Sequence, residues 1–232
     1  MPLMLRSTAE NVFELGHMPL DGLLAGDDNT NPDPSFVGSA ITGVFSFKGR
    51  LGFLSGASVS LTEVKFGSYD ALKDIQHYNV YRTSVASLLD NDTIDVTVSS
   101  AHVVNLRNAV PFQDNLVMFS EFGQFVLRGG DLLTIKTVSA NPITEYECDS
   151  SVAPVSLGSY IYFPFRRGSF TGVREFTMTV DRDVYDANEI TSHVPQYIPT
   201  NLVAMSGAAS EELLALTDGT DVYIDKYFFS GN

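Results

Sequence analysis

The 232-residue chain has no tryptophan, one cysteine and only 14 lysines and arginines. Cys148 has no partner for an intrachain disulfide, so nothing in the sequence points to an oxidising compartment. No apolar run approaches the ~18 residues of a membrane helix. Glu10, Glu14 and Asp21 follow soon after Met1–Leu5, which does not fit the basic-then-apolar pattern of a signal peptide. We therefore expect no membrane insertion by this chain.

Basic residues are too few and too scattered for a nucleic-acid clamp. The chain has 28 acidic residues and a net charge of −14, and only Arg166 and Arg167 are adjacent. A surface this acidic repels phosphate over a Debye length of about 8 Å. A clamp needs clustered Lys and Arg to release counterions, so the composition argues against that class.

What the chain does have is a run of short apolar segments within Ala109–Ser139. We predict four strands separated by polar or glycine turns. The expected strands are Ala109–Phe112, Leu116–Ser120, Gln124–Arg128 and Thr134–Ser139. Four strands in about thirty residues is the size of one β-propeller blade.

The same unit recurs along the chain. Phe47–Leu51, Phe112–Leu116 and Leu157–Ile161 each place two apolar residues four apart across a turn, and an apolar strand follows. A looser copy begins at Met205 and resumes at Leu213–Thr217. Two of the three intervals fall within the ~40–50 residues of a blade. Irregular hairpins of an ordinary antiparallel β protein are the alternative.

The repeat predicts which side chains form the core. We expect nine residues to be buried at equivalent positions of successive sheets: Phe47, Leu51, Phe53, Phe112, Leu116, Met118, Leu157, Ile161 and Phe163.

The predicted fold class is all-β, with propeller-like blades of antiparallel strands. Residues 1–38 are expected to form an N-terminal arm and an Asx/Pro-rich loop, and residues 39–232 the propeller-like domain. An insertion at about 66–95 interrupts the first blade and contains the main helix candidate, Tyr69–Asp90; a second, short helix is expected at Tyr185–Thr191. The absence of tryptophan argues against the tryptophan-aspartate and sialidase-type propellers.

Two acidic clusters have side-chain oxygens that could bind a metal. Alternating oxygens occur in Asp27, Asn29, Asn31 and Asp33, as in a calcium loop. The calcium pattern needs glycine at its sixth position and glutamate at its twelfth, where this chain has Pro32 and Gly38. The second cluster is Asp181, Asp183 and Asp186, which also lacks a glycine pivot. A rigid Asx turn is the favoured interpretation, and no metal site is predicted.

No catalytic or cofactor-binding residue is predicted either. Cys148 lies between Glu147 and Asp149, whose charges raise a thiol pKa and oppose nucleophilicity. The histidines do not pair at zinc-ligand spacing; they are His17, His77, His102 and His193. With 28 acidic residues, a general acid/base carboxylate pair stays open but cannot be located.

A series of motifs runs in one order through roughly residues 26–199. They are Gly26–Gly38, Arg50–Leu54, Arg82-Thr83, Leu88–Asp92, Ile94–Val96, Ala109–Phe112, Gln124–Gly129, Leu132–Thr134, Lys136–Ser139, Glu145–Cys148, Tyr162–Pro164, Val173–Glu175, Tyr185–Thr191, His193–Pro195 and Tyr197–Pro199. In these motifs the chain resembles the tail nozzle, or tail tubular protein B, family of short-tailed bacteriophages. Members of that family are longer, so the resemblance covers a central portion.

The resemblance implies a structural protein of the virion tail, assembled in the host cytoplasm. It implies a hexameric ring of this chain below the tail adaptor protein, around the channel through which genomic DNA leaves. It further implies roles in DNA retention, ejection and tail-fibre attachment, with no enzymatic residues to transfer. The insertion around Phe66–Val80 is longer than the family pattern, so the chain departs from the family at this surface. The alternative is a phage-borne glycan-degrading or carbohydrate-binding propeller.

The number of units leads to one more expectation. Propellers close with about four to eight blades, and four candidate units are visible here. We therefore expect an incomplete ring, whose remaining blades belong to a companion chain or are absent because the sequence is a fragment. Strand edges at Val222–Phe229 would then tend to pair with other chains.

Overall fold

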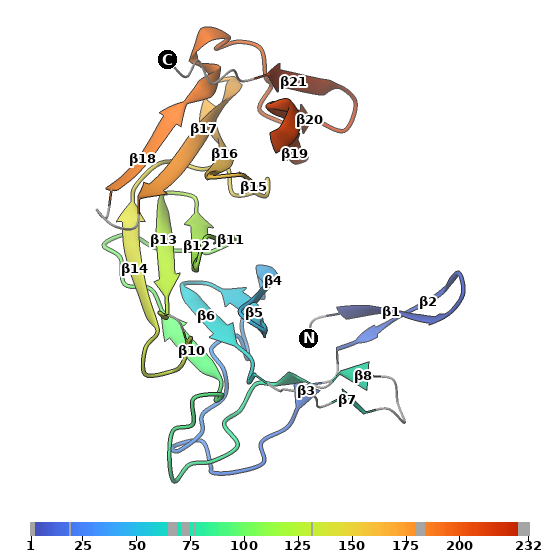
Figure 1. The fold of residues 1–232 in the computed structure, drawn as a ribbon, viewed down its shortest axis with the longest axis vertical. Coiled ribbons are helices and arrows are strands. Elements are labelled where there is room, and N and C mark those ends of the chain that lie inside the picture. Colours follow the sequence, from blue (N-terminus) through green and yellow to red (C-terminus); the bar gives the residue numbers. More distant parts are fainter. Residues whose placement is uncertain are drawn as a thin grey trace.

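The computed structural model describes residues 3–18, 20–64, 69–70, 75–76, 78–130, 132–179 and 184–226. The described chain is all-β, and its helical elements are two short 3-10 turns, η2 (Ile190–His193) and η3 (Ala209–Glu211). Figure 1 shows the strands gathered into successive small antiparallel sheets. The all-β prediction is confirmed.

Four sheets, here numbered I to IV in chain order, carry the architecture. Sheet I contains β4 (Gly43–Phe47), β5 (Arg50–Ser55), β6 (Ser58–Leu61) and β10 (Ile94–Thr97). Sheet II contains β11 (Asn108–Phe112), β12 (Asn115–Ser120), β13 (Gly123–Arg128) and β14 (Ser139–Thr144). Sheet III contains β15 (Val155–Leu157), β16 (Tyr160–Arg167), β17 (Phe170–Thr179) and β18 (Val184–Glu189). Sheet IV contains β19 (Ala204–Ala208), β20 (Leu213–Thr217) and β21 (Val222–Lys226).

Smaller strand pairs lie at the N-terminal side. An antiparallel hairpin is formed by β1 (Leu3–Ala9) and β2 (Val12–His17). A parallel pair joins β3 (Leu20–Asp21) to β9 (Tyr78–Asn79). Within the insertion, β7 (Tyr69–Asp70) pairs with β8 (Ile75–Gln76).

The four sheets stack face to face in sequence order. Leu54 of sheet I and Leu116 of sheet II share one apolar cluster. Phe119 of sheet II and Phe163 of sheet III meet in the next, with ring centroids 5.4 Å apart. A third cluster joins sheets III and IV. The first strands also contact one another in turn, β4 with β11, β11 with β15 and β15 with β19. In Figure 1 the result is an open arc with sheets I and IV at its two ends.

Two-residue turns recur between the first and second strands, as the sequence predicts. The closing pairs are Phe47 with Arg50, Phe112 with Asn115 and Leu157 with Tyr160. The turns contain residues with positive φ, which suits the right-handed twist of the flanking strands; they are Lys48, Gly49, Gln113 and Gly158. In sheet IV the 3-10 turn η3 replaces the tight turn. The hairpin repeat is confirmed.

Equivalent core residues face equivalent neighbours. Phe47, Phe112 and Leu157 each point toward the sheet that follows their own. Leu116 and Ile161, with the Met118 and Phe163 that come two residues later, point toward the sheet that precedes. Leu51 and Phe53 face the N-terminal segments in the same way. Eight of the nine predicted core residues are buried and Leu51 is half-buried, since no full sheet precedes sheet I in the described residues.

The fourth strand of the Ala109–Ser139 unit was placed too early. Residues 135–137 form a turn, and the edge strand is β14 (Ser139–Thr144). Thr134 and Thr137 bond each other's backbone and hydroxyl groups, which competes with a sheet ladder. The edge strand contains Pro142, opposite Phe125, and proline is tolerated there because an edge has no outer neighbour.

The predicted helix at Tyr69–Asp90 is wrong where the structure describes it. Its described part contains β7, β8 and β9, followed by irregular chain from Val80. Val85, Leu88 and Leu89 are all exposed, so their partly helical spacing marks no buried face. The chain between β6 and β10, which pair in sheet I, contains this segment.

The short helix predicted at Tyr185–Thr191 is mostly the strand β18. Tyr185–Glu189 pair with β17, and the 3-10 turn begins only at Ile190. Tyr185 stacks on Phe176 with ring planes 17° apart, a cross-strand contact that favours the extended form.

Candidate functional site

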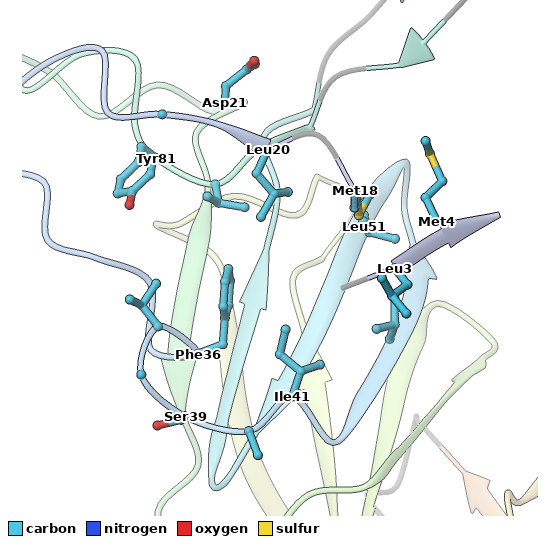
Figure 2. Close-up of a pocket in the computed structure, with 16 residues that line it drawn as sticks. Leu3, Met4, Met18, Leu20, Asp21, Phe36, Ser39, Ile41, Leu51 and Tyr81 are labelled. Carbon is cyan, nitrogen blue, oxygen red and sulfur yellow. The ribbon is translucent and has the colours of Figure 1, made fainter. Parts of the chain in front are cut away.

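The N-terminal end of the arc has an apolar pocket with a volume of about 950 Å³. Figure 2 shows Phe36, Ile41 and Leu51 among the side chains that line it, with Leu3 and Met4 from the foot of the hairpin. The ring of Phe36 packs on the buried ring of Phe53, 5.0 Å away. Such a wall is suited to covering hydrophobic surface rather than to acid, base or nucleophilic chemistry.

The rim of this pocket is tied to the Asx/Pro-rich loop. Tyr81 donates its hydroxyl hydrogen bond to the carboxylate of Asp33 at 2.8 Å. That hydrogen bond, with burial and the nearby negative charge, raises the pKa of the Tyr81 phenol. Ser35 donates from its amide and its hydroxyl to Asp95, at 2.6 and 2.8 Å. The loop is therefore anchored to both the insertion and sheet I.

The side chains of Asp27, Asn31 and Asp33 bond different partners. Asp27 accepts bonds from the amides of Asn29 and Thr30, and the hydroxyl of Thr30 also donates to it. These bonds, that of the Thr30 side chain first, lower the Asp27 pKa. The Asp27 carboxylate therefore closes an Asx turn, which is the kind of turn that the sequence predicts for this loop.

Asn31 is the buried pivot of that turn. Its side-chain amide donates to the carbonyls of Ala25 and Arg82, at 2.9 and 2.8 Å. Its oxygen accepts from the Arg82 amide at 3.1 Å. The residue is thus fully used in joining the loop to the insertion. Among the described residues, no group of three or more His, Cys, Asp or Glu side chains is gathered as metal ligands would be.

The second acidic cluster is only partly visible. Asp181 and Asp183 lie outside the described residues. Asp186 is exposed on β18, where its carboxylate accepts bonds from the Ala187 amide and the Asn188 side chain.

Cys148 is a core residue rather than a reactive thiol. It is buried in the cluster between sheets II and III. Burial, and then the charge of Asp149, raise the pKa of the thiol far above its ordinary value, so the thiolate is scarce near neutral pH. The adjacent hollow of about 330 Å³ has mixed charge, because Arg107 and Arg166 line it together with Glu121, Glu147 and Asp149.

The histidines lie apart from one another in the described part of the chain. His17 and His102 are exposed, and His77 is outside the described residues. His193 ends η2 with its Nδ1 atom 3.0 Å from the Ile190 carbonyl oxygen. That contact agrees with the structural turn role inferred from the sequence.

The most heavily bonded buried charge, Arg50, was missed as a special residue by sequence reasoning. Arg50 is 1% exposed, and its guanidinium donates to the carbonyls of Thr62, Asp92 and Leu133 at 2.8, 2.6 and 3.1 Å. A further bond reaches the Asp90 carbonyl. Burial lowers the Arg50 pKa. One side chain thus fastens sheet I, the end of the insertion and the turn region of sheet II.

The first strands of the four sheets share one chemical property. None of β4, β11, β15 and β19 contains an Asp, Glu, Lys or Arg. These strands follow one another along one edge of the arc. The strands at this edge therefore carry no acidic residue. The described helices, both single turns, are too short to cross a membrane.

Comparisons with known proteins agree with the motifs. The model of the bacteriophage nozzle protein family matches residues 1–232. Tail tubular protein gp12 of Escherichia phage T7 is 35% identical over 233 residues, which cover 99% of this chain and 28% of that protein. The chain thus spans little more than a quarter of that relative's length.

Among solved structures, one similar chain is a quinonprotein alcohol dehydrogenase-like protein from Bacteroides thetaiotaomicron. It is 11% identical, with a TM-score of 0.39, and the match covers 79% of this chain and 50% of that one. A likeness at this level has no bearing on function. The match over the whole chain and the identity to the phage relative decide the assignment: the chain belongs to the bacteriophage nozzle protein family.

Proposed function

We propose that this chain is a structural wall segment of a virion tail nozzle, which assembles with copies of itself into a ring around the DNA exit channel. The observation that supports this most directly is the unbroken stacking of sheets I to IV through three apolar clusters. Close-packed sheets deform little, as a wall that carries a pressurised genome must. Membership of the bacteriophage nozzle protein family supports the assignment of this wall to a phage tail.

We further interpret sheets I to IV as blades of a propeller-like unit. Three features support this interpretation: up-and-down strand order in each sheet, stacking in chain order, and first strands that meet along one edge. Closure would limit exposed strand edges. The remaining blades would come from other parts of a longer polypeptide or from a companion chain.

In this proposal the DNA passes through the channel without specific binding. A conduit must let a polyanion slide without binding it, and a net charge of −14 per chain suits that task. The nozzle retains DNA before infection and releases it during ejection. The tail adaptor protein and a tail-fibre protein are the proposed neighbours, and assembly takes place in the host cytoplasm.

Electron microscopy tests the assembly. We expect the purified chain at high concentration to form symmetric rings with a central pore, and a gold-labelled tag on the chain to mark the tail of assembled particles. A label on the capsid shell would contradict the tail assignment. Monomers at every concentration would contradict ring formation by this chain.

A gel-shift titration tests the conduit. Because the charges of ring copies add, we expect no detectable affinity for duplex DNA near 0.15 M salt. A cationic protein of similar mass serves as the positive control. A shift at micromolar protein under these conditions would favour a DNA clamp instead.

A further inference from the structure

The hollow between sheets II and III has a volume of about 330 Å³ and has no role in the proposed wall. Its residues come from the chain before β11, the turn between β12 and β13, the connection from β14 to β15, and the end of β16. Small-molecule sites have volumes of about 300–1,000 Å³, and loops held by a rigid scaffold are the usual carriers of binding residues. The hollow therefore has the size and the position of a site for one small ligand.

Backbone hydrogen bonds hold the walls of this hollow in place. The Cys148 amide donates to the Glu121 carbonyl of sheet II at 2.9 Å, and the Asp149 amide donates to the Pro164 carbonyl of sheet III at 2.7 Å. The connection between the two sheets is thus tied to both of them. A ligand that enters does not have to order this connection first, which lowers the cost of binding.

The hollow is lined by charged side chains of both signs that do not pair with one another. Arg107, Glu121 and Glu147 line it, and within the described parts of the chain their side chains form no hydrogen bond or ion pair. Arg166 differ from these three, since it pairs with Asp149 at 3.1 Å. The hollow therefore has hydrogen-bond donors and acceptors that a bound molecule can bridge.

An aromatic ring lines the same hollow. Phe122 lies in the turn between β12 and β13 and is 52% exposed. The face of an aromatic ring carries partial negative charge, so it attracts the partially positive C–H groups of a ligand. Phe122 thus provides a flat apolar surface beside the polar groups.

The charges of the hollow select a neutral ligand. The carboxylates of Glu121, Glu147 and Asp149 oppose an anion, as does the net charge of −14. The two guanidinium groups oppose a cation in the same way. A ligand that fits donates to carboxylates, accepts from a guanidinium and presents C–H groups to a ring. A sugar, with several hydroxyl groups on a ring that has an apolar face, has all three properties.

We propose that the hollow between sheets II and III binds one neutral sugar residue, whose apolar face lies against the ring of Phe122. Arg107 donates to oxygen atoms of the sugar, and the carboxylates of Glu121 and Glu147 accept from its hydroxyl groups. All of these residues belong to a single copy of the chain, so the site does not depend on the proposed ring. The chain would thereby recognise a glycan in addition to its structural role.

Ligand-observed NMR tests the site on the full chain. The probes are the methyl glycosides of glucose, galactose, mannose and N-acetylglucosamine. We expect saturation transfer to at least one of them, with a dissociation constant of roughly 0.1–10 mM, because a single sugar residue offers few contacts to offset the entropy cost of association.

Three variants locate the binding. Phe122→Ala should weaken binding of that glycoside roughly fivefold or more, because the ring contact is lost. Arg107→Gln should weaken it roughly tenfold, because hydrogen bonds from a charged donor are lost. Phe13→Ala removes an equally exposed ring from the β1–β2 hairpin and should leave the affinity unchanged. All three side chains are exposed, and unchanged thermal unfolding would show that the sheets stay folded.

Several outcomes would overturn the inference. No saturation transfer to any of the glycosides at about 20 mM would reject the site. Equal binding by Phe122→Ala would place the sugar elsewhere on the chain. Tighter binding of inorganic phosphate or of free glycine would identify an anion or a zwitterion as the ligand instead. Rings without sugar binding would reject this inference and leave the proposed function standing, whereas sugar binding without rings would do the reverse.

Discussion

Sheet II and the β1–β2 hairpin are both antiparallel and both rich in apolar residues, yet their burial is opposite. All six residues of β12 are buried, whereas β2 has five exposed residues of six. In β12, Met118 faces sheet I and Phe119 faces sheet III. The hairpin has Leu5, Phe13 and Leu15 on one side, and no described residue forms a second layer over them. Whether a strand is buried in this molecule therefore depends on the sheets that pack against it. The strand's own sequence pattern shows only whether one or both of its faces are apolar.

The largest effect should come from removing an aromatic ring between two sheets. Phe112 is 3% exposed in the cluster between sheets II and III. Phe112→Ala should lower the free energy of unfolding by about 3–5 kcal/mol, because the site loses apolar contacts and keeps a cavity. Phe13→Ala, on the exposed hairpin, should stay within about 0.5 kcal/mol. Denaturant unfolding measures both, and equal losses would refute the contrast.

The second-largest loss of stability should come from changing Arg50. Lysine at this position keeps the charge but replaces a planar fork with a single ammonium group. Arg50→Lys would leave some of the carbonyls of Thr62, Asp92 and Leu133 without a donor. Each buried unsatisfied group costs about 1–3 kcal/mol.

Arg166→Lys is the matched exposed change, since that side chain is 67% exposed. It should shift the unfolding free energy by less than about 0.5 kcal/mol. Chemical denaturation distinguishes the two, and a neutral Arg50→Lys would show that the guanidinium does not fasten the insertion.

A glycine pair gives a third, smaller contrast. A Cβ atom at Gly172 would lie 2.5 Å from the ring of Phe165, which sits across the strand pair. Gly172→Ala should therefore cost about 1–3 kcal/mol through overpacking. At Gly16 in the hairpin a Cβ would meet nothing within 4 Å, and alanine there should be neutral or stabilise by up to about 1 kcal/mol. A thermal midpoint that falls more for Gly16→Ala would reverse the expected order.

The strands of the stacked sheets were predictable because local chemistry and burial agree there. Leu116–Ser120 is a continuous apolar run, the pattern of a strand covered on both faces. The pairing of Phe112 with Asn115 requires a two-residue turn, and the polar residues Gln113 and Asp114 are suited to one.

Prediction failed for two different reasons, one local and one distant in the sequence. Thr134–Ser139 has the composition of a strand, but hydroxyl bonds between Thr134 and Thr137 hold a turn. The spacing of Leu88 and Leu89 suggested a helix, whereas Asn31 and Arg82 bond across the sequence and fix an irregular path.

In the candidate site, too, local sequence predicted a turn but not a contact with distant residues. The Asx turn at Asp27 was predictable, because Asp and Asn side chains bond the backbone two residues on. The role of Arg50 could not be predicted, because its acceptors are backbone carbonyls up to 83 residues away. Backbone carbonyls have no signature in a sequence.

The smallest contrast concerns the carboxylate of Asp149, beside the hollow between sheets II and III. Burial alone would raise its pKa, but bonds from the Ser151 hydroxyl and from Arg166 outweigh burial and lower it below 3.8. A carboxylate with a depressed folded-state pKa stabilises the fold above its unfolded-state pKa, and that stabilisation is lost as pH falls through the lower folded-state value.

Asp149→Asn should therefore lower the thermal midpoint at pH 7, and the difference from the unmodified chain should shrink between about pH 5 and pH 2. Asp28→Asn, at an exposed position of the N-terminal loop, is the control and should change little at either pH. Calorimetry across this range provides the measurement. A difference that stays constant down to pH 2 would mean that Asp149 acts through the shape of its hydrogen bonds rather than through its charge.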